Sequence, residues 1–134
     1  MDLLVEIVSP DGTVFRGEAH RFRAPGVEGA FEVLRGHAPM LAACGTGTVY
    51  ITLPDGKRVA YATSGGFVEV LNDRVILLAE TAEPASEIDV DRAREAEQNA
   101  LARLDASSTP EERRAAQEKL DKQRSRLRAA MASV

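Results

Sequence analysis

The segment Ile88-Asp89-Val90-Asp91-Arg92-Ala93 carries the pair of side chains best suited to chemistry in this chain. Asp89 and Arg92 are three residues apart, so on a helix they share one face. A carboxylate there can accept a hydrogen bond from an amine, and a guanidinium can bind a phosphate or ribose oxygen. The same pair would also serve as a helix N-cap with an ion pair worth roughly a few tenths of a kcal/mol. A small-ligand site and a helix cap both stay open.

Two basic side chains further along could extend such a site. Lys122 and Arg126 are one helical turn apart, and in an antiparallel helical hairpin they would offer additional contacts to phosphate. They lie within residues 113–128, which hold seven Lys or Arg and two Asp or Glu. The simpler interpretation of this run is a solvated helix face. The alternative is a surface that docks on an acidic partner.

Familiar catalytic and metal-binding patterns do not occur in the sequence. The chain has two His and one Cys, which excludes zinc-type ligand spacing, and it has no GxxxxGK[ST] phosphate loop. Ser64 has no evident general base, and we expect Cys44 to be buried and inert. The net charge of −4 argues against a general nucleic-acid binder. We therefore expect no catalytic residue, no metal and no required cofactor.

The first residues, MDLLVEIVSPDG, lack the basic segment and apolar core of a signal peptide. No apolar run approaches the roughly 20 residues of a membrane span. A single cysteine excludes an internal disulfide. We expect a soluble protein in a reducing compartment.

The elements that must position these side chains differ between the two parts of the chain. All ten glycines lie in the first 66 residues, and the last of the six aromatics is Phe67. Short apolar runs separated by Gly, Pro, Asn and Asp are typical of strands joined by turns. We expect strands at 3–9, 13–17, 20–24, 30–34, 40–44, 48–53, 57–63, 66–71 and 74–80. Many short strands in about 80 residues predict an all-β sandwich or barrel over residues 1–85.

Residues 86–134 contain no glycine and repeat alanine and leucine at helical spacing. Ser86 followed by Asp89 suggests a capping box, and Thr109-Pro110-Glu111-Glu112 is a strong helix start. We expect helices at about 88–104 and 110–131, folded as an antiparallel hairpin. With four leucines, this hairpin buries little apolar surface and should depend on the sandwich or on a partner to stay compact.

In their order and spacing, several segments resemble the epsilon subunit of the F-type rotary ATP synthase. They are Val8-Ser9-Pro10, Gly36-His37-Ala38-Pro39, Ser64-Gly65-Gly66-Phe67-Val68-Glu69-Val70 and Ile88-Asp89-Val90-Asp91-Arg92-Ala93. The resemblance implies a β-sandwich of about ten strands followed by the helical hairpin. It implies a non-catalytic subunit bound to the gamma subunit and the c-ring, with a hairpin that extends toward the alpha/beta subunits and inhibits ATP hydrolysis. It also implies a peripheral location on the cytoplasmic face of the bacterial inner membrane rather than on a plastid thylakoid.

Two sets of site residues follow from the same resemblance. ATP is implied as a regulatory ligand of the compact form, at Glu83, Ile88, Asp89, Arg92, Ala93, Lys122 and Arg126. Partner contacts are implied at Glu28, Glu32, Arg35 and His37. Asn99 stands where a basic residue is expected, and Lys122 stands where arginine is expected and lacks its bidentate geometry.

Two alternatives concern the same residues. In one, the protein is a structural adaptor whose hairpin stays docked because Leu101, Leu104, Leu120 and Leu127 cover the sandwich. In the other, Ser64 and His37 form a small hydrolase site. The segment Arg35-Gly36-His37-Ala38-Pro39 is itself open to two interpretations, a tight turn or a loop that contacts a partner.

Overall fold

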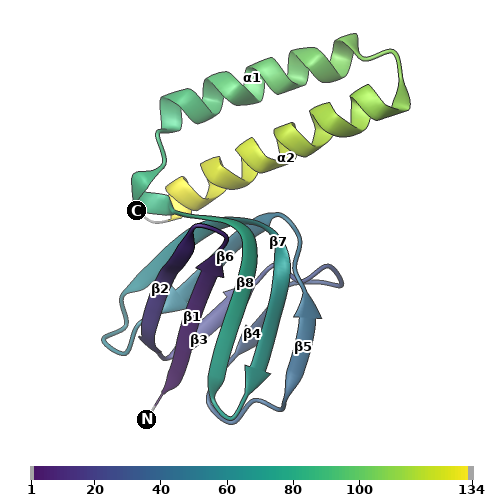
Figure 1. Cartoon of the computed structure of the whole chain (residues 1–134). Coiled ribbons are helices and arrows are strands. Elements are labelled where there is room, and N and C mark those ends of the chain that lie inside the picture. Colours follow the sequence, from purple (N-terminus) through teal and green to yellow (C-terminus); the bar gives the residue numbers. More distant parts are fainter. Residues whose placement is uncertain (1, 133–134) are drawn as a thin grey trace.

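The computed structural model describes residues 2–132, and it shows eight strands followed by two long helices (Figure 1). The strands are β1 (Leu3–Ser9), β2 (Gly12–Ala19), β3 (Arg21–Ala24), β4 (Phe31–Val33), β5 (Met40–Ala43), β6 (Gly47–Thr52), β7 (Arg58–Leu71) and β8 (Arg74–Pro84). A 3-10 turn, η1 (Ala85–Glu87), leads into α1 (Val90–Ala106) and α2 (Pro110–Ala132). The expected β-sandwich followed by an antiparallel helical hairpin is confirmed. No helix in the described part of the chain is long and apolar enough to cross a membrane.

The strands form two layers because β7 and β8 each take part in both. In the first layer the order is β2-β1-β8-β7-β5, with β1 pairing in parallel with residues 74–78 of β8. In the second layer the order is β4-β3-β6-β7-β8, where β7 contributes residues 58–63 and β8 its C-terminal part. The two layers are therefore covalently continuous through the β7–β8 hairpin.

Strand β7 explains why eight strands appear where nine strand ranges were predicted from the sequence. The predicted strands 57–63 and 66–71 are one element, because Gly65 and Gly66 carry the chain through a bend without breaking the pairing with β8. Gly66 has φ +124°, and a Cβ there would collide with the carbonyl oxygen of Leu78. Only glycine fits this backbone, so the turn signal that the glycines give in the sequence marks a bend within a strand.

The core lies between the two layers and follows the strand alternation. Inward-facing side chains are fully buried, and the largest are Phe22, Leu3, Ile7, Ile51 and Leu77. Outward-facing residues of the same strands are partly or fully exposed. This period-two pattern of burial is what fixes the register of each strand.

The two helices begin at different kinds of cap. Asp89 is the N-cap of α1, and its Oδ1 accepts a hydrogen bond from the backbone N–H of Arg92 at 3.1 Å. The predicted capping role of Ser86 is wrong, because Ser86 lies inside η1, before the helix begins. Thr109 caps α2 as expected, accepting a hydrogen bond from the N–H of Glu112 at 3.1 Å.

The hairpin lies across one end of the sandwich, and β1 begins at the opposite end (Figure 1). Helix α2 packs on the outer face of β6 and β7, whereas α1 packs mainly on α2 and joins the contact with the sandwich at its start, through Ala93. The contact cluster comprises Ala60, Ala62, Ala85, Ile88, Ala93 and Ala129, with Tyr50, Leu127 and Ala130 at its margin. Of the four leucines expected to cover the sandwich, only Leu127 belongs to this contact. The expectation is wrong for Leu101 and Leu104, which lie on α1, and Leu120 is not part of the cluster.

Candidate functional site

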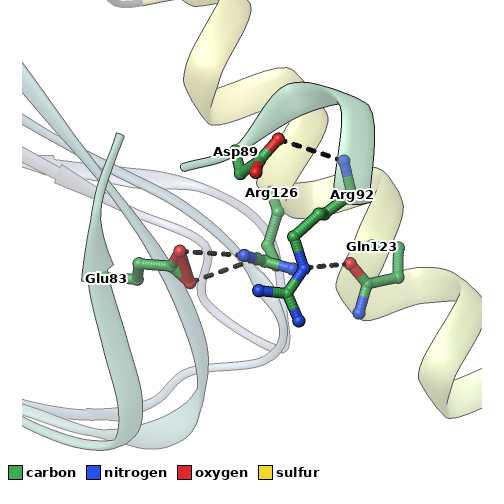
Figure 2. A network of polar contacts seen from close by, with 5 residues as sticks. All are labelled: Glu83, Asp89, Arg92, Gln123 and Arg126. Carbon is green, nitrogen blue, oxygen red and sulfur yellow. Dashed lines mark hydrogen bonds and ion pairs between the residues drawn. The ribbon is translucent and has the colours of Figure 1, made fainter. Parts of the chain in front are cut away.

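The junction between hairpin and sandwich contains a two-point ion pair. Arg126 Nη2 donates to Glu83 Oε1 at 2.9 Å, and Arg126 Nε donates to Glu83 Oε2 at 3.1 Å (Figure 2). Gln123, one turn earlier on α2, accepts from Arg126 Nη1 at 2.8 Å. Bidentate geometry strengthens such a contact, and the Arg126 side chain is 21% exposed. The guanidinium is thus held at one defined position between β8 and α2.

Asp89 and Arg92 lie beside this pair, at the start of α1 (Figure 2). The Asp89 carboxylate caps the helix and forms no ion pair with the Arg92 guanidinium among the described residues. Arg92 is exposed, and its guanidinium remains available to a ligand. The helix-cap interpretation of Asp89 is confirmed, and a ligand contact by either residue stays a prediction.

Ile88 and Ala93 flank Asp89 and are buried. Ile88 is 8% exposed and Ala93 fully buried, and both belong to the alanine-rich contact between hairpin and sandwich. In this arrangement they hold the start of α1 against α2 and the sheet. A ligand would meet their backbone or require the junction to open.

A polar cavity of about 270 Å³ lies between α2 and strands β7 and β8. Lys122, Ser125 and Arg126 line it from α2, and Glu80 and Glu83 line it from β8. Ser125 is 1% exposed, and its hydroxyl has no hydrogen-bond partner in the described structure. Ser125 therefore contributes a polar group, and little apolar area, to this face of the contact.

Lys122 also borders a second cavity, of about 670 Å³, between the two helices. Asn99 and Gln123 line that cavity as well. Lys122 and Asn99, the two positions that depart from the expected basic pattern, therefore lie together. The predicted nucleotide residues all gather around the junction, from β8, the start of α1 and the middle of α2.

The predicted partner residues are divided by β4. Glu28 lies in the loop before this strand, and Arg35 and His37 lie in the loop after it. Glu32, within β4, pairs with Arg21 and Arg23 at 3.8 Å each. Glu28 and His37 therefore belong to two different loops, and a partner contact by either residue stays a prediction.

Within residues 2–132, Ser64 and His37 do not come together as the hydrolase alternative requires. The Oγ of Ser64 hydrogen-bonds to Thr81 Oγ1 at the bend of β7, whereas the loop that holds His37 lies beyond the far end of that strand. The hydrolase alternative is wrong for this reason. Cys44 is buried, and desolvation raises the pKa of its thiol, which fits an inert side chain. Among residues 2–132, no three His, Cys, Asp or Glu side chains form a metal-binding group.

Sequence reasoning missed two residues of the junction. Gln123 precedes Arg126 by three residues, and that helical spacing was a usable signal for their hydrogen bond. Ser125 carried no signal, because a serine between two basic residues is typical of an exposed helix face. Its burial depends on how α2 is rotated against the sheet, which is a tertiary property.

Comparisons with known proteins agree with the architecture. The family model for the ATP synthase Delta/Epsilon chain, beta-sandwich domain, matches residues 2–85. The ATP synthase epsilon chain of Salinibacter ruber is 49% identical over 112 residues, covering 78% of this chain and 75% of its own. That of Desulforamulus reducens is 40% identical over 126 residues, covering 94% of this chain and 95% of its own.

Two solved structures share the fold at low sequence identity. A chain of the Euglena gracilis mitochondrial ATP synthase, in an assembly of OSCP, F1 and c-ring, superposes with a TM-score of 0.86 at 23% identity. The superposition covers 97% of the present chain and 81% of the Euglena gracilis chain, so the similarity includes the hairpin. A chain from the central stalk and c-ring of the Tetrahymena thermophila mitochondrial enzyme gives a TM-score of 0.64 at 16% identity, covering 97% of both. From the family match and the identities of the curated relatives, the chain belongs to the ATP synthase epsilon chain family.

Proposed function

We propose that this protein is a non-catalytic subunit of the central stalk of a proton-translocating ATP synthase. It couples proton flow to ATP synthesis through its sandwich and inhibits ATP hydrolysis through its hairpin. Membership of the epsilon chain family supports the assignment to the central stalk of ATP synthase. The inhibitory part rests on how weakly the hairpin is attached to the sandwich. Because the curated relatives are bacterial, we place the complex at the cytoplasmic face of the bacterial inner membrane.

An apolar patch on the outer face of the first layer supports docking to the gamma subunit. The strand register puts Leu41 of β5, Phe67 of β7 and Leu78 of β8 on one face, and each is more than half exposed. A cluster of exposed large apolar side chains on a sheet is typical of a protein interface. The hairpin packs on the other layer and does not cover this face. The patch is therefore accessible to a permanently bound partner such as the gamma subunit.

The composition of the hairpin contact is the observation that carries the inhibitory role. Five of its six buried members are alanines, which bury little area each. Beyond this cluster, the hairpin is attached by the Glu83–Arg126 pair, which borders the polar cavity. An element with few apolar contacts opens at low free energy, so partner surfaces can compete for it. The basic residues of α2, within 113–128, would then bind an acidic surface of the alpha/beta subunits.

The test is ATP hydrolysis by the reconstituted complex, with the full chain or with a chain that ends at residue 85. We expect the shortened chain to support coupled proton pumping and to raise the rate of hydrolysis. Equal hydrolysis rates would remove the inhibitory role. The full chain is the positive control: if it does not support proton pumping either, the reconstitution has failed.

ATP is the ligand we propose for the compact form. Arg92, Lys122 and Arg126 supply positive charge around the junction, and a phosphate would have to share Arg126 with Glu83. Calorimetry with MgATP should show binding to the full chain and its loss in Arg126→Ala. Arg124→Ala is the matched control, because Arg124 faces Glu97 on the other helix. If no heat of binding is measured at millimolar MgATP, ATP binding is contradicted and Asp89 acts only as a helix cap.

A structural adaptor with a permanently docked hairpin is the second candidate. The complete burial of Ala93 and Ala129 in the contact favours it. Hydrogen exchange separates the two candidates, because a fixed hairpin exchanges its amides as slowly as the strands do. Faster exchange of α1 and α2, with slow exchange in β7 and β8, supports the mobile hairpin.

A further inference from the structure

The loop of residues 34–39, between β4 and β5, is attached to a distant turn by one hydrogen bond. The backbone N–H of Gly36 donates to Oδ1 of Asp73 at 2.7 Å. Asp73 lies 37 residues further along, in the turn between β7 and β8. In the described part of the chain, no other side chain outside the loop hydrogen-bonds to it.

The acceptor sits on a rigid support. Asn72 and Asp73 form the two-residue turn between the paired residues Leu71 and Arg74, with φ of 52° and 62°. These positive φ values define a tight hairpin turn that matches the strand twist. The backbone carbonyl of Asp73 also accepts a hydrogen bond from the N–H of Leu4 at 2.9 Å, which ties the turn to β1. Asp73 itself is half-buried.

The bonded loop presents two side chains that can bind a partner. Arg35 is exposed and His37 is half-buried. The ring Nδ1 of His37 donates to the carbonyl of Ala38 at 2.7 Å, so this contact does not use the second ring nitrogen, Nε2. Gly36, between them, has φ +86°. Glycine has more accessible backbone conformations than other residues, so a hydrogen bond to its N–H restricts the loop.

We propose that Asp73 is a positioning residue for the docking loop, where the docking loop means residues 34–39. By accepting the Gly36 hydrogen bond, it holds Arg35 and His37 in one arrangement for contact with the c-ring. The proposal rests on the proposed place in the ATP synthase and on the partner contact expected for Arg35 and His37, but the hydrogen bond itself can be tested on the isolated chain. A loop ordered before binding loses less entropy on docking, so affinity should fall when the bond is removed.

The turn allows a clean set of variants. Asp73→Gly keeps a residue that accepts positive φ and removes the acceptor. Asp73→Asn keeps both the φ preference and a side-chain oxygen. Asn72→Gly alters the same turn without touching the acceptor, and is the matched control.

The first measurement is amide hydrogen exchange of Gly36 in the isolated full chain. Asp73→Gly should raise its rate about five- to tenfold, the ratio expected from one lost hydrogen bond. Asp73→Asn should retain most of the protection, and Asn72→Gly should match the parent. Unchanged exchange in Asp73→Gly overturns the positioning role.

The second measurement is the concentration of chain that restores proton pumping to an ATP synthase depleted of this subunit. Asp73→Gly should require several-fold more chain, with Asp73→Asn restoring the parent value. If His37→Ala and Arg35→Ala leave the concentration unchanged, the docking role of the loop fails, while the exchange result on Gly36 still stands. If those two variants impair pumping and Asp73→Gly does not, the positioning role fails alone.

Discussion

Arg126 on α2 and Glu83 on β8 form the only ion pair between the hairpin and the sandwich in the described part of the chain. The two residues are 43 positions apart in sequence, and each uses two atoms of its charged group. The pair therefore marks the docked state, since it can exist only when α2 lies on the sheet.

Glu83→Gln should loosen the hairpin and leave the sandwich intact. The amide keeps an oxygen for one hydrogen bond but loses the charge, which for a partly exposed pair contributes about 0.5–1 kcal/mol. Amides of α1 and α2 should then exchange about two- to fivefold faster. In the reconstituted enzyme, ATP hydrolysis should be inhibited more strongly, because the docked form is disfavoured.

The control for that change is Glu97→Gln, which breaks the Arg124–Glu97 contact of 3.4 Å between the two helices. This contact does not involve the sandwich, so exchange in β8 and docking should stay as in the parent. Equal effects of the two variants would mean that the hairpin loosens internally instead of undocking.

Ala129→Leu should undock the hairpin by overpacking. Ala129 is fully buried in the contact cluster, and extra methyl groups in a packed site cost about 1–3 kcal/mol. The thermal transition of the sandwich should shift little, since its core is a separate cluster. Ala102→Leu, at an exposed position of α1, is the matched control. A fall in sandwich stability equal to the loss of docking would contradict two separable units.

Phe67→Ser should separate partner binding from folding. Phe67 is 54% exposed on the apolar patch, so its loss should cost under about 1 kcal/mol of stability and weaken binding to the gamma subunit. Phe22→Ala, at a fully buried core position, should cost about 3–5 kcal/mol in urea unfolding. Unchanged gamma binding by Phe67→Ser would remove this face as the docking surface.

Gly66→Ala should damage the sandwich more than its size suggests. The added Cβ collides with the backbone of β8 at the bend. To relieve this collision β7 and β8 would have to separate, and their backbone pairing extends through both layers. We expect a loss of more than about 3 kcal/mol or failure to fold. Gly17→Ala is the control, because its Cβ would make an ordinary contact with Phe15 at 3.6 Å. Similar urea midpoints for the two variants would show that the bend tolerates a side chain.

The fold could be predicted from the sequence because its signals are local. The Pro54-Asp55-Gly56 and Asn72-Asp73 turns, together with the change from period two to helical spacing, place the strands and the helices near their observed positions. The bend in β7 was missed, since two glycines give the same signal in a turn and inside a strand. The parallel pairing of β1 with β8 also left no trace, because it joins residues about 70 positions apart.

The site was harder to predict than the fold. Ile88, Asp89, Arg92 and Ala93 came from a resemblance, which indicates residues but gives no account of what they contact. Whether Ile88 faces a ligand or the sheet depends on how η1 directs the chain out of β8, and no local pattern encodes that direction. The pairing of Glu83 with Arg126 likewise depends on the rotation of α2. Nucleotide binding at these residues stays a prediction.

The parallel pairing of β1 with β8 has a mechanical consequence. Strand β8 is flanked by β1 and β7, and its C-terminal end continues directly into the hairpin. A pull on the hairpin therefore loads β8 along its own length. A force along the strand shears all the backbone hydrogen bonds between β8 and its neighbours together. A force perpendicular to the strand would break the same bonds one after another. The sandwich is consequently built to resist traction from the helices even though it holds them loosely.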